Sequence, residues 1–182
     1  KDTLLLGAKQ ACDENGAAVV FVARQITRAP SACTLIERPV TDDAFDAATE
    51  KGEHAISWAA HGVRYAIPAA SMVEAIASHP HAKIVLNVSR GVFDSVQQKY
   101  GDIADVYVLL FSASPKALRE RLTARGREDA AEIEERISRA HAYHPPKVQM
   151  HKVLRVSNDG TLARGVQLLT NVLLRPRVTT VV

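Results

Sequence analysis

Continuous apolar runs alternate with helix-forming segments along most of this chain. Four runs predict strands, at 17–23, 82–88, 105–113 and 152–158, and the first three are rich in β-branched and large apolar residues. A run without polar alternation is typical of a strand buried on both faces, as in a parallel sheet. The remaining segments predict helices at 1–16, 42–52, 70–79, 91–101, 114–126, 127–143 and 161–174. Strands that alternate with helices predict βαβ units and an α/β fold with a parallel sheet.

The segment after the first run follows a different pattern. Residues 24–41 show no regular period and are expected to be irregular. Residues 54–67 predict two short strands that meet at His61-Gly62 and form a hairpin. The helix predicted at 127–143 is strongly charged and has few large apolar residues, so we expect it to project from the body of the protein.

Arginines follow the predicted strands closely. The loops after the four strands begin at Arg24, Ser89, Ala113 and Ser157, and three of these loops carry an Arg close behind the strand. In open α/β sheets, ligands bind outside the carboxyl ends of the strands. The sequence therefore predicts several guanidinium groups around one crevice, and such groups suit phosphate.

Composition limits the classes of function. The chain has 182 residues, 47% of them hydrophobic, which suits one compact domain (1–182). The net charge is only +3 and aromatic residues make up 5%, so the clustered basic face of a nucleic-acid binder is not expected. Dispersed arginines favour small-molecule substrates with compact negative charge.

Two cysteines, Cys12 and Cys33, do not form a disulfide framework or a C-x-x-C motif. Their number predicts a reduced, cytoplasmic setting. No apolar run is long enough to cross a membrane, so no membrane contact is expected. The oligomeric state is left open, a homodimer included.

Six short segments together carry a resemblance to a known family. They are Lys1-Asp2, ARQITRAPS (23–31), FDAATEKGEHAISWAAHGVRYAIP (45–68), LNVSRG (86–91), RERLTARGREDAAEIEERISRA (119–140) and SNDG (157–160). In combination they resemble the guanylate kinase-like family, and more closely the bacterial ribose 1,5-bisphosphate phosphokinases of phosphonate metabolism. The resemblance implies a P-loop NTPase three-layer sandwich with a small acceptor-binding insertion (30–68) and an Arg-rich lid (122–143).

The resemblance gives the start of the chain a role in ATP binding. Lys1-Asp2-Thr3 is similar to the end of G-x-x-x-x-G-K-[ST], in which backbone N–H groups and the Lys hold phosphates. The glycines of that loop and the strand before it are absent, which we interpret as truncation, and the sheet is then expected to have a gap in its middle. Asp2 stands where a Ser or Thr usually binds Mg²⁺, so Asp2 is a weak candidate metal ligand.

The resemblance also implies an acceptor site. Arg28 and Tyr65 would hold the phosphate of the acceptor, with Glu37, Ser89 and Arg90 as further acceptor-binding residues. Three of these residues have a structural alternative: Arg28 and Arg90 as solvated loop arginines, and Tyr65 as a half-buried hairpin aromatic. Guanine-reading groups of guanylate kinases are missing, which favours an acceptor richer in phosphate.

Five arginines lie within 19 residues in the lid, at 121, 125, 127, 136 and 139. The resemblance implies that Arg121, Arg125 and Arg136 face the nucleotide and the transferred phosphate, and are catalytic with Lys1. We expect Arg119 and Arg139 to form surface ion pairs instead. Asn158 and Asp159 would line the adenine pocket, or form an Asx-type turn, or both.

The implied reaction transfers phosphate from ATP, with Mg²⁺, to ribose 1,5-bisphosphate and gives 5-phosphoribosyl 1-diphosphate. Guanylate kinase activity with GMP is the nearest alternative. An inactive guanylate kinase-like binding module is a second alternative, and retention of Lys1 and the lid arginines argues against it. A nucleic-acid binder is a third.

Overall fold

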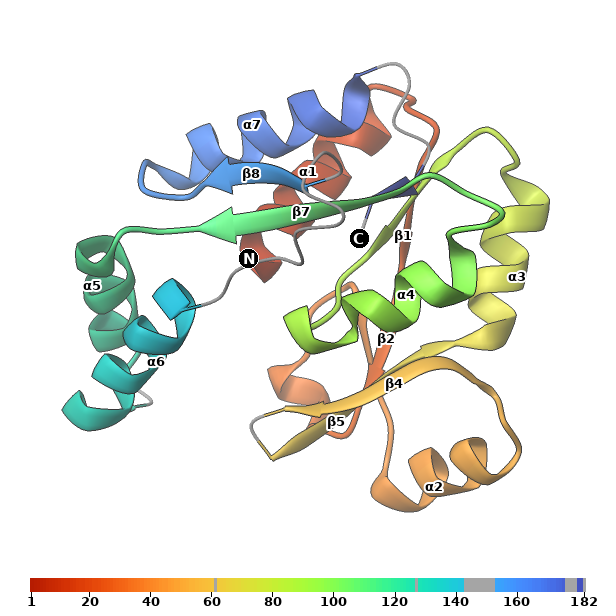
Figure 1. The fold of residues 1–182 in the computed structure, drawn as a ribbon, viewed down its shortest axis with the longest axis horizontal. Coiled ribbons are helices and arrows are strands. Elements are labelled where there is room, and N and C mark those ends of the chain that lie inside the picture. Colours follow the sequence, from red (N-terminus) through yellow and green to blue (C-terminus); the bar gives the residue numbers. More distant parts are fainter. Residues whose placement is uncertain (61, 127, 143–152, 176–179, 182) are drawn as a thin grey trace.

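The computed structural model describes residues 1–60, 62–126, 128–142, 153–175 and 180–181. Its larger sheet has five parallel strands in the order β1-β6-β9-β7-β8 (Figure 1). The strands are β1 (Val19–Val22), β6 (Lys83–Leu86), β9 (Thr180–Val181), β7 (Val106–Ser112) and β8 (Val153–Ser157). Four of these strands were predicted from the apolar runs, and β9 was not.

Helices cover both faces of this sheet, which confirms the predicted three-layer α/β architecture (Figure 1). One face packs against α1 (Asp2–Glu14) and α7 (Leu162–Leu174), and the other against α3 (Ala69–Ser78) and α4 (Phe93–Tyr100). None of the helices in the described ranges is long and apolar enough to cross a bilayer.

Strand β6 shows why the apolar runs lack alternation. Val85 joins the core beneath α1 and α7, whereas Ile84 and Leu86 join the core beneath α3 and α4. All three side chains are buried. Because successive side chains of a strand point to opposite faces, a strand between two helical layers is apolar at successive positions in its interior.

Small residues let α1 and α7 approach each other closely. A Cβ atom at Gly165 would lie 2.6 Å from Cδ2 of Leu4, and one at Gly7 would lie 2.6 Å from a methyl carbon of Val166. A side chain at either glycine would force the helices apart. This close contact holds the start of α1, and the candidate site with it, against the sheet.

A lysine of the larger sheet caps the carbonyl groups at the C-terminal end of α7. Lys83, the first residue of β6, is buried, and its Nζ atom donates to the carbonyl oxygens of Leu173 and Arg175. The last carbonyls of a helix have no partner within the helix, and a cation there also complements the helix dipole. Lys83 therefore links the C-terminal end of α7 to the first residue of β6.

A second sheet lies below the first, with the strand order β3-β2-β5-β4 (Figure 1). It contains β2 (Arg24–Ile26), β3 (Glu37–Pro39), β4 (His54–Ala60) and β5 (Val63–Pro68), with α2 (Asp42–Glu50) beside it. The hairpin of β4 and β5 was predicted; Gly62 has a φ of +70° in its turn, and His61 lies outside the described residues.

The expectation that residues 24–41 are irregular was wrong. Strands β2 and β3 pair in parallel within this segment, and β2 also pairs with β5. Each of the two strands has only three residues, too few to produce a recognisable period in the sequence. Their pairing is set by the tertiary structure instead.

Two helices project to one side of both sheets, α5 (Pro115–Arg125) and α6 (Ala130–Ala142) (Figure 1). Ser114 caps α5 by accepting from the Ala117 N–H at 3.3 Å, and Gly126 ends it in the left-handed conformation, both as predicted. Leu122, Ile133 and Ile137 form a small core of their own between the two helices. The pair is therefore held together separately from the two larger cores.

Strand β9 lies where the sequence led us to expect a gap in the sheet. Thr180 and Val181 pair in parallel with Ile84–Val85 of β6 on one side and with Val106–Tyr107 of β7 on the other. These partners belong to the first residues of β6 and β7. A strand of two residues gives no sequence signal, because a strand is recognised from runs of four or more.

Candidate active site

A pocket lies at the carboxyl ends of β6 and β7, beside the start of α1. Lys1, Ser89 and Arg90 line it, together with Phe93 and apolar residues of the two strands. The Nζ atom of Lys1 lies 3.4 Å from the carbonyl oxygen of Val88. The structure thus brings together three of the residues that the sequence indicated, from the start of α1 and from the loop after β6.

The surroundings of Lys1 change its ionisation. Burial lowers the pKa of its side-chain ammonium group, Asp2 raises it, and Arg24 and Arg90 lower it, with a net downward shift. An anionic ligand would stabilise the charged form of this lysine and offset the repulsion from the neighbouring guanidinium groups. Lys1 and Arg90 therefore give one part of a mostly apolar pocket the positive charge that an anion needs.

Asp2 and Thr3 occupy the first turn of α1, where helix N–H groups lack partners within the helix. Oδ1 of Asp2 accepts from Nδ2 of Asn87 at 2.9 Å, and Oδ2 lies 3.6 Å from Nη2 of Arg24. Burial raises the pKa of Asp2, but Lys1, Asn87 and Arg24 lower it by more. The carboxylate is therefore ionised at neutral pH. Thr3 is exposed beside it.

The donors around Asp2 fit a magnesium ion that arrives with a nucleotide. No group of three or more His, Cys, Asp or Glu in the described ranges could hold a metal ion on its own. Oδ1 of Asn87, on the amide that contacts Asp2, is buried and has no hydrogen-bond partner among the described residues. Mg²⁺ is commonly held by one or two carboxylates with substrate phosphates and water, which matches this sparse donor set.

Arg24 stands at the centre of a buried polar cluster that the sequence did not predict. Its Nη2 and Nε atoms donate to Oε1 of Glu37 at 2.6 and 3.3 Å, and its Nη1 donates to the Asn87 carbonyl oxygen at 3.2 Å. Its guanidinium carbon lies 4.8 Å from the centre of the Tyr65 ring. The cluster depends on the pairing of β2 with β3, which lies in the segment expected to be irregular.

Glu37 was expected to bind the acceptor, and the structure gives it a different position. Its side chain is 1% exposed. Oε1 accepts from Arg24, while Oε2 accepts from the backbone N–H and the hydroxyl of Thr34, both at 3.0 Å. Both oxygens are thus satisfied inside the protein, so Glu37 acts here as the partner of Arg24.

Arg28 and Tyr65 meet on the smaller sheet. Nη2 of Arg28 donates to the Tyr65 hydroxyl at 3.3 Å. The Tyr65 ring stacks on Trp58, with ring centres 5.3 Å apart and planes 7° from parallel. Arg28 is partly exposed, while Tyr65 is buried. The Tyr65 hydroxyl therefore lies beside a partly exposed guanidinium group.

The lid arginines divide into two groups. Nη2 of Arg121 donates to the Gly160 carbonyl oxygen at 3.2 Å, so Arg121 reaches the loop after β8. Arg125 and Arg136 both donate to Oε1 of Glu128, which is 10% exposed and was not indicated by the sequence. Glu128, between α5 and α6, thus holds the two guanidinium groups side by side. Arg127 lies outside the described residues.

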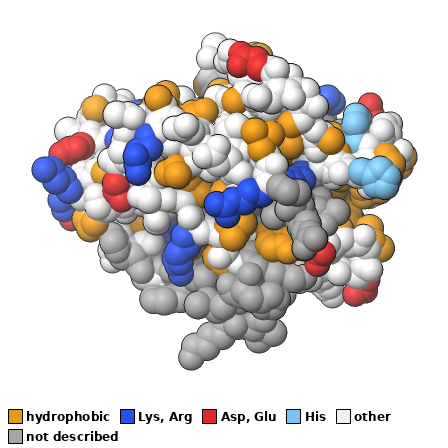
Figure 2. All heavy atoms as spheres, turned by 90° about the horizontal axis from the view of Figure 1, so that it is seen from above, with side chains coloured by type: hydrophobic (Ala, Val, Ile, Leu, Met, Phe, Trp, Pro, Cys, Tyr) orange, Lys and Arg blue, Asp and Glu red, His pale blue; other side chains and the backbone are white. Residues whose placement is uncertain are grey.

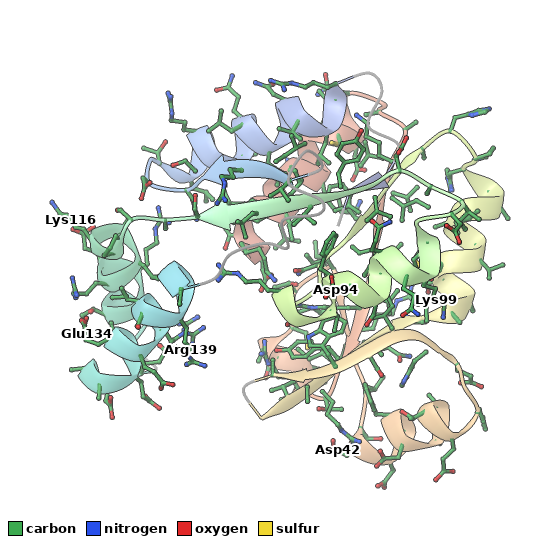
Figure 3. All side chains as sticks on the ribbon, in the orientation of Figure 1. Asp42, Asp94, Lys99, Lys116, Glu134 and Arg139 are labelled. Carbon is green, nitrogen blue, oxygen red and sulfur yellow. The ribbon has the colours of Figure 1, made fainter. Side chains whose placement is uncertain are left out.

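Arg119 and Arg139 form surface ion pairs, as predicted. Arg119 donates to both oxygens of Glu134, at 2.8 and 2.9 Å, and Nε of Arg139 lies 3.5 Å from Oε1 of Glu135. All four side chains are at least half exposed. Figure 3 marks Glu134 and Arg139 on the helix pair, apart from the two sheets.

Asp159 joins two segments through its carboxylate, whereas Thr161 caps the last helix, α7. The carboxylate accepts from the backbone N–H of Ser114 at 2.5 Å and from the Ser157 hydroxyl at 3.0 Å. The hydrogen bonds from Ser114 are the main cause of a lowered pKa for Asp159. The Asp159 carboxylate thus ties the loop after β8 to the start of α5. Asn158 continues the ladder, with its N–H donating to the Ser112 carbonyl oxygen at 2.8 Å.

Basic side chains do not form one continuous patch on the face seen in Figure 2, where Lys and Arg lie as separate groups among hydrophobic and uncharged atoms. The described guanidinium groups of the site come instead from separate loops and from the lid. Such an arrangement can neutralise compact negative charges held at several points.

Comparison with solved structures identifies the fold. A guanylate kinase from Anaplasma phagocytophilum matches with a TM-score of 0.56 and 16% sequence identity, over 92% of this chain and 79% of that one. The fold is therefore guanylate kinase-like, as the sequence predicted. No family model matches the chain.

Relatives at higher identity define the family. A ribose 1,5-bisphosphate phosphokinase PhnN from Pseudofrankia inefficax is 37% identical over 174 residues, which cover 96% of this chain and 84% of the relative. Another from Desulfomicrobium baculatum is 33% identical and is covered over 90% of its length. A bifunctional ribose 1,5-bisphosphokinase-thymidine phosphorylase from Azorhizobium caulinodans is 33% identical, with 23% of its length covered. The chain belongs to the ribose 1,5-bisphosphate phosphokinase family, which confirms the resemblance.

Proposed function

We propose that this protein transfers the γ-phosphoryl group of ATP to ribose 1,5-bisphosphate, giving ADP and 5-phosphoribosyl 1-diphosphate in the breakdown of phosphonates. The observation that carries the proposal is the match to a ribose 1,5-bisphosphate phosphokinase at 37% identity over 96% of the chain. The grouping of Lys1, Ser89 and Arg90 in one pocket supports it.

The reaction needs positioning more than acid–base chemistry. An oxygen of the 1-phosphate forms a bond to the γ-phosphorus while the bond from that phosphorus to the β,γ-bridging oxygen breaks, and ADP leaves. The attacking oxygen is already ionised at neutral pH, so no general base is required. Catalysis then consists of alignment and neutralisation of charge on the transferred group.

The donor side of the site is assigned to the start of α1 and the lid. Lys1 reaches the β- and γ-phosphates of ATP, and the N–H groups in the turn of Asp2 and Thr3 assist. Arg121, Arg125 and Arg136 stabilise the transferred phosphoryl group. Asn158 and Asp159, in the loop after β8, line the pocket for adenine. Closure of α5 and α6 over the site would exclude water, whose attack would hydrolyse ATP.

The acceptor side is assigned to the smaller sheet and the loop after β6. Arg28 and the Tyr65 hydroxyl bind one phosphate of the sugar, and Ser89 and Arg90 bind the other. Two phosphates at opposite ends of a ribose explain why the site has guanidinium groups in two separate loops. Glu37 is left out of this set because both its carboxylate oxygens are used within the protein.

Mg²⁺ would be held by the ATP phosphates and water, with Asp2 and the Asn87 amide oxygen as the protein groups nearest to it. When bound, the ion neutralises charge on the phosphates that flank the transferred group. Asp2 is ionised for this role because Lys1, Asn87 and Arg24 lower its pKa.

The proposal is tested by measuring ADP formation by the full-length protein with either ribose 1,5-bisphosphate or GMP as acceptor. We expect turnover with the sugar bisphosphate and at most a trace with GMP. GMP turnover at a comparable rate would assign the protein to guanylate kinases instead.

The variant Lys1→Ala should abolish phosphoryl transfer, while circular dichroism and thermal unfolding stay close to those of the wild type. Survival of transfer in this variant would contradict the role of Lys1.

A further inference from the structure

We infer that Arg24 is a positioning residue that fixes the acceptor-binding sheet to the donor end of the site; the inference rests on the proposed function. Arg24 begins β2 and is 5% exposed. Its guanidinium group touches groups from four other elements: Asp2 in α1, Glu37 in β3, Tyr65 in β5 and the Asn87 carbonyl at the end of β6.

These contacts join two parts of the site whose residues are far apart in the sequence. Asp2 and Asn87 belong to the side that faces ATP in the proposed mechanism, because they would lie nearest to the Mg²⁺ that ATP carries. Tyr65 belongs to the side that faces the acceptor, because its hydroxyl accepts from Arg28 at 3.3 Å. Arg24 contacts both sides: it donates to the Asn87 carbonyl oxygen and lies over the ring of Tyr65. The distance between donor and acceptor phosphates therefore depends on this one side chain.

Arg24 has few donors left for a substrate. Nε and one Nη2 hydrogen are directed at Glu37, and Nη1 donates to the Asn87 carbonyl oxygen. Glu37, in turn, is 1% exposed and receives two further hydrogen bonds from Thr34. The pair is closed to solvent and to ligands, so its effect on the reaction must act through the residues that it holds.

The buried Arg24–Glu37 pair is better suited to fix the positions of its neighbours than to raise the free energy of unfolding. Removing a guanidinium and a carboxylate from water is costly, and well-packed apolar residues often stabilise a core as much as a buried pair does. A planar fork with five donors can serve several partners in fixed directions, which an ammonium group cannot. The contact with the Tyr65 ring also depends on that planar group. Arg24→Lys therefore keeps the charge but loses the geometry.

The test compares kinetics of the full-length variants Arg24→Lys and Glu37→Gln with those of Arg119→Lys. Arg119 is the matched control, because it also pairs with a Glu but lies on the exposed lid surface. We expect kcat to fall by about 10- to 100-fold in the first two variants, because misplacement of reacting groups by about 1 Å has an effect of that size. The KM values for ATP and for the sugar bisphosphate should change by less than about threefold, since neither substrate touches Arg24.

A second readout does not depend on the identity of the acceptor. Trp58 is the only tryptophan of the 182 residues and stacks on Tyr65, so its emission reports the packing of that ring. We expect a shifted emission spectrum in folded Arg24→Lys and in Glu37→Gln, and none in Arg119→Lys, with Trp58→Phe as the blank. The Arg24→Lys/Glu37→Gln double variant should be no slower than the slower single variant, because the two side chains act as one unit.

The outcomes separate this inference from the proposed function. If the folded variants keep kcat within about twofold of the wild type, the inference is overturned. A rise in the acceptor KM at unchanged kcat would also overturn it, because Arg24 would then bind the substrate directly. If the wild type turns over neither acceptor, the proposed function fails, while an unshifted Trp58 emission in both variants would still reject the positioning role. Should Arg24→Lys fail to fold, Glu37→Gln alone decides by the same criteria.

Discussion

The guanidinium group of Arg28 lies 3.3 Å from the hydroxyl of Tyr65, although the two residues are 37 positions apart in the chain. Arg28 follows the short strand β2, and Tyr65 lies in β5, which pairs with β2 through Ile26. The antiparallel pairing thus brings both groups to one end of the smaller sheet. Stacking on Trp58 keeps the Tyr65 ring from turning away.

Removal of the Tyr65 hydroxyl should weaken acceptor binding selectively. For Tyr65→Phe we expect the KM for the sugar bisphosphate to rise about tenfold, the size of one hydrogen bond to a charged group. The KM for ATP should not change, because the hydroxyl lies on the acceptor-binding sheet. Steady-state kinetics with each substrate varied in turn provides the measurement. An equal rise in both KM values would contradict the assignment of Tyr65 to the acceptor.

The lid arginines should differ sharply in their effect on catalysis. Arg136→Lys removes one of the two guanidinium groups gathered at Glu128, and we expect kcat to fall by at least about tenfold, as loss of one charge-stabilising donor does. Arg119→Lys changes a guanidinium group on the same lid that is paired at the surface with Glu134, and kcat should stay within about twofold. Single-turnover rates of both variants under saturating ATP would make the comparison. Equal loss in the two variants would show that the lid acts only as a structural unit.

The larger sheet and its helices were predictable because each element carries its own signal. Residues 84–86 are apolar at every position, since β6 is buried by helices on both faces. Ser114 and Gly126 stand at the two ends of α5, where a cap and a left-handed residue are needed. Such local features specify an element without knowledge of its neighbours.

The buried cluster of the site was not predictable, because it depends on neighbours alone. Arg24 and Glu37 are 13 positions apart and meet only because β2 and β3 pair in parallel. Each strand has three residues, so neither the pairing nor its register leaves a period in the sequence. The same holds for Glu128, which looks like any other acid of a charged helix until Arg125 and Arg136 are seen to share it.

The pairing of Glu37 with Arg24 should make stability depend on pH in the acid range. Burial raises the pKa of Glu37, but hydrogen bonds from Arg24 and Thr34 lower it by more, to below its usual value of 4.5. A lowered pKa in the folded state means that Glu37 stabilises the fold above about pH 4.5 and that this contribution is lost as the pH falls through the folded pKa. Urea unfolding at pH 7.0, 4.5 and 3.5 measures the effect.

Glu37→Gln is the matching variant. At neutral pH it should be less stable than the wild type by about 3 kcal/mol, because a buried guanidinium group loses its counter-charge. The difference should narrow as the wild-type carboxyl group becomes protonated. Parallel stability curves for the two proteins over this range would show that Glu37 does not titrate as the structure implies.

Lys83 offers a test of the fold that should leave the chemistry untouched. Its buried Nζ atom donates to the Leu173 and Arg175 carbonyl oxygens at the end of α7. Lys83 begins β6, whereas Lys1 lies beside Val88, past the other end of that strand. Lys83→Met keeps the length of the side chain but removes the charge and the donors, so we expect a loss of about 1–2 kcal/mol in the free energy of unfolding. Lys9→Met is the control, because Lys9 pairs with Asp13 on the exposed face of α1 and should contribute little. Chemical unfolding of both variants, together with kcat for the folded proteins, separates stability from activity. A loss of stability in Lys9→Met as large as that in Lys83→Met would contradict the capping role of Lys83.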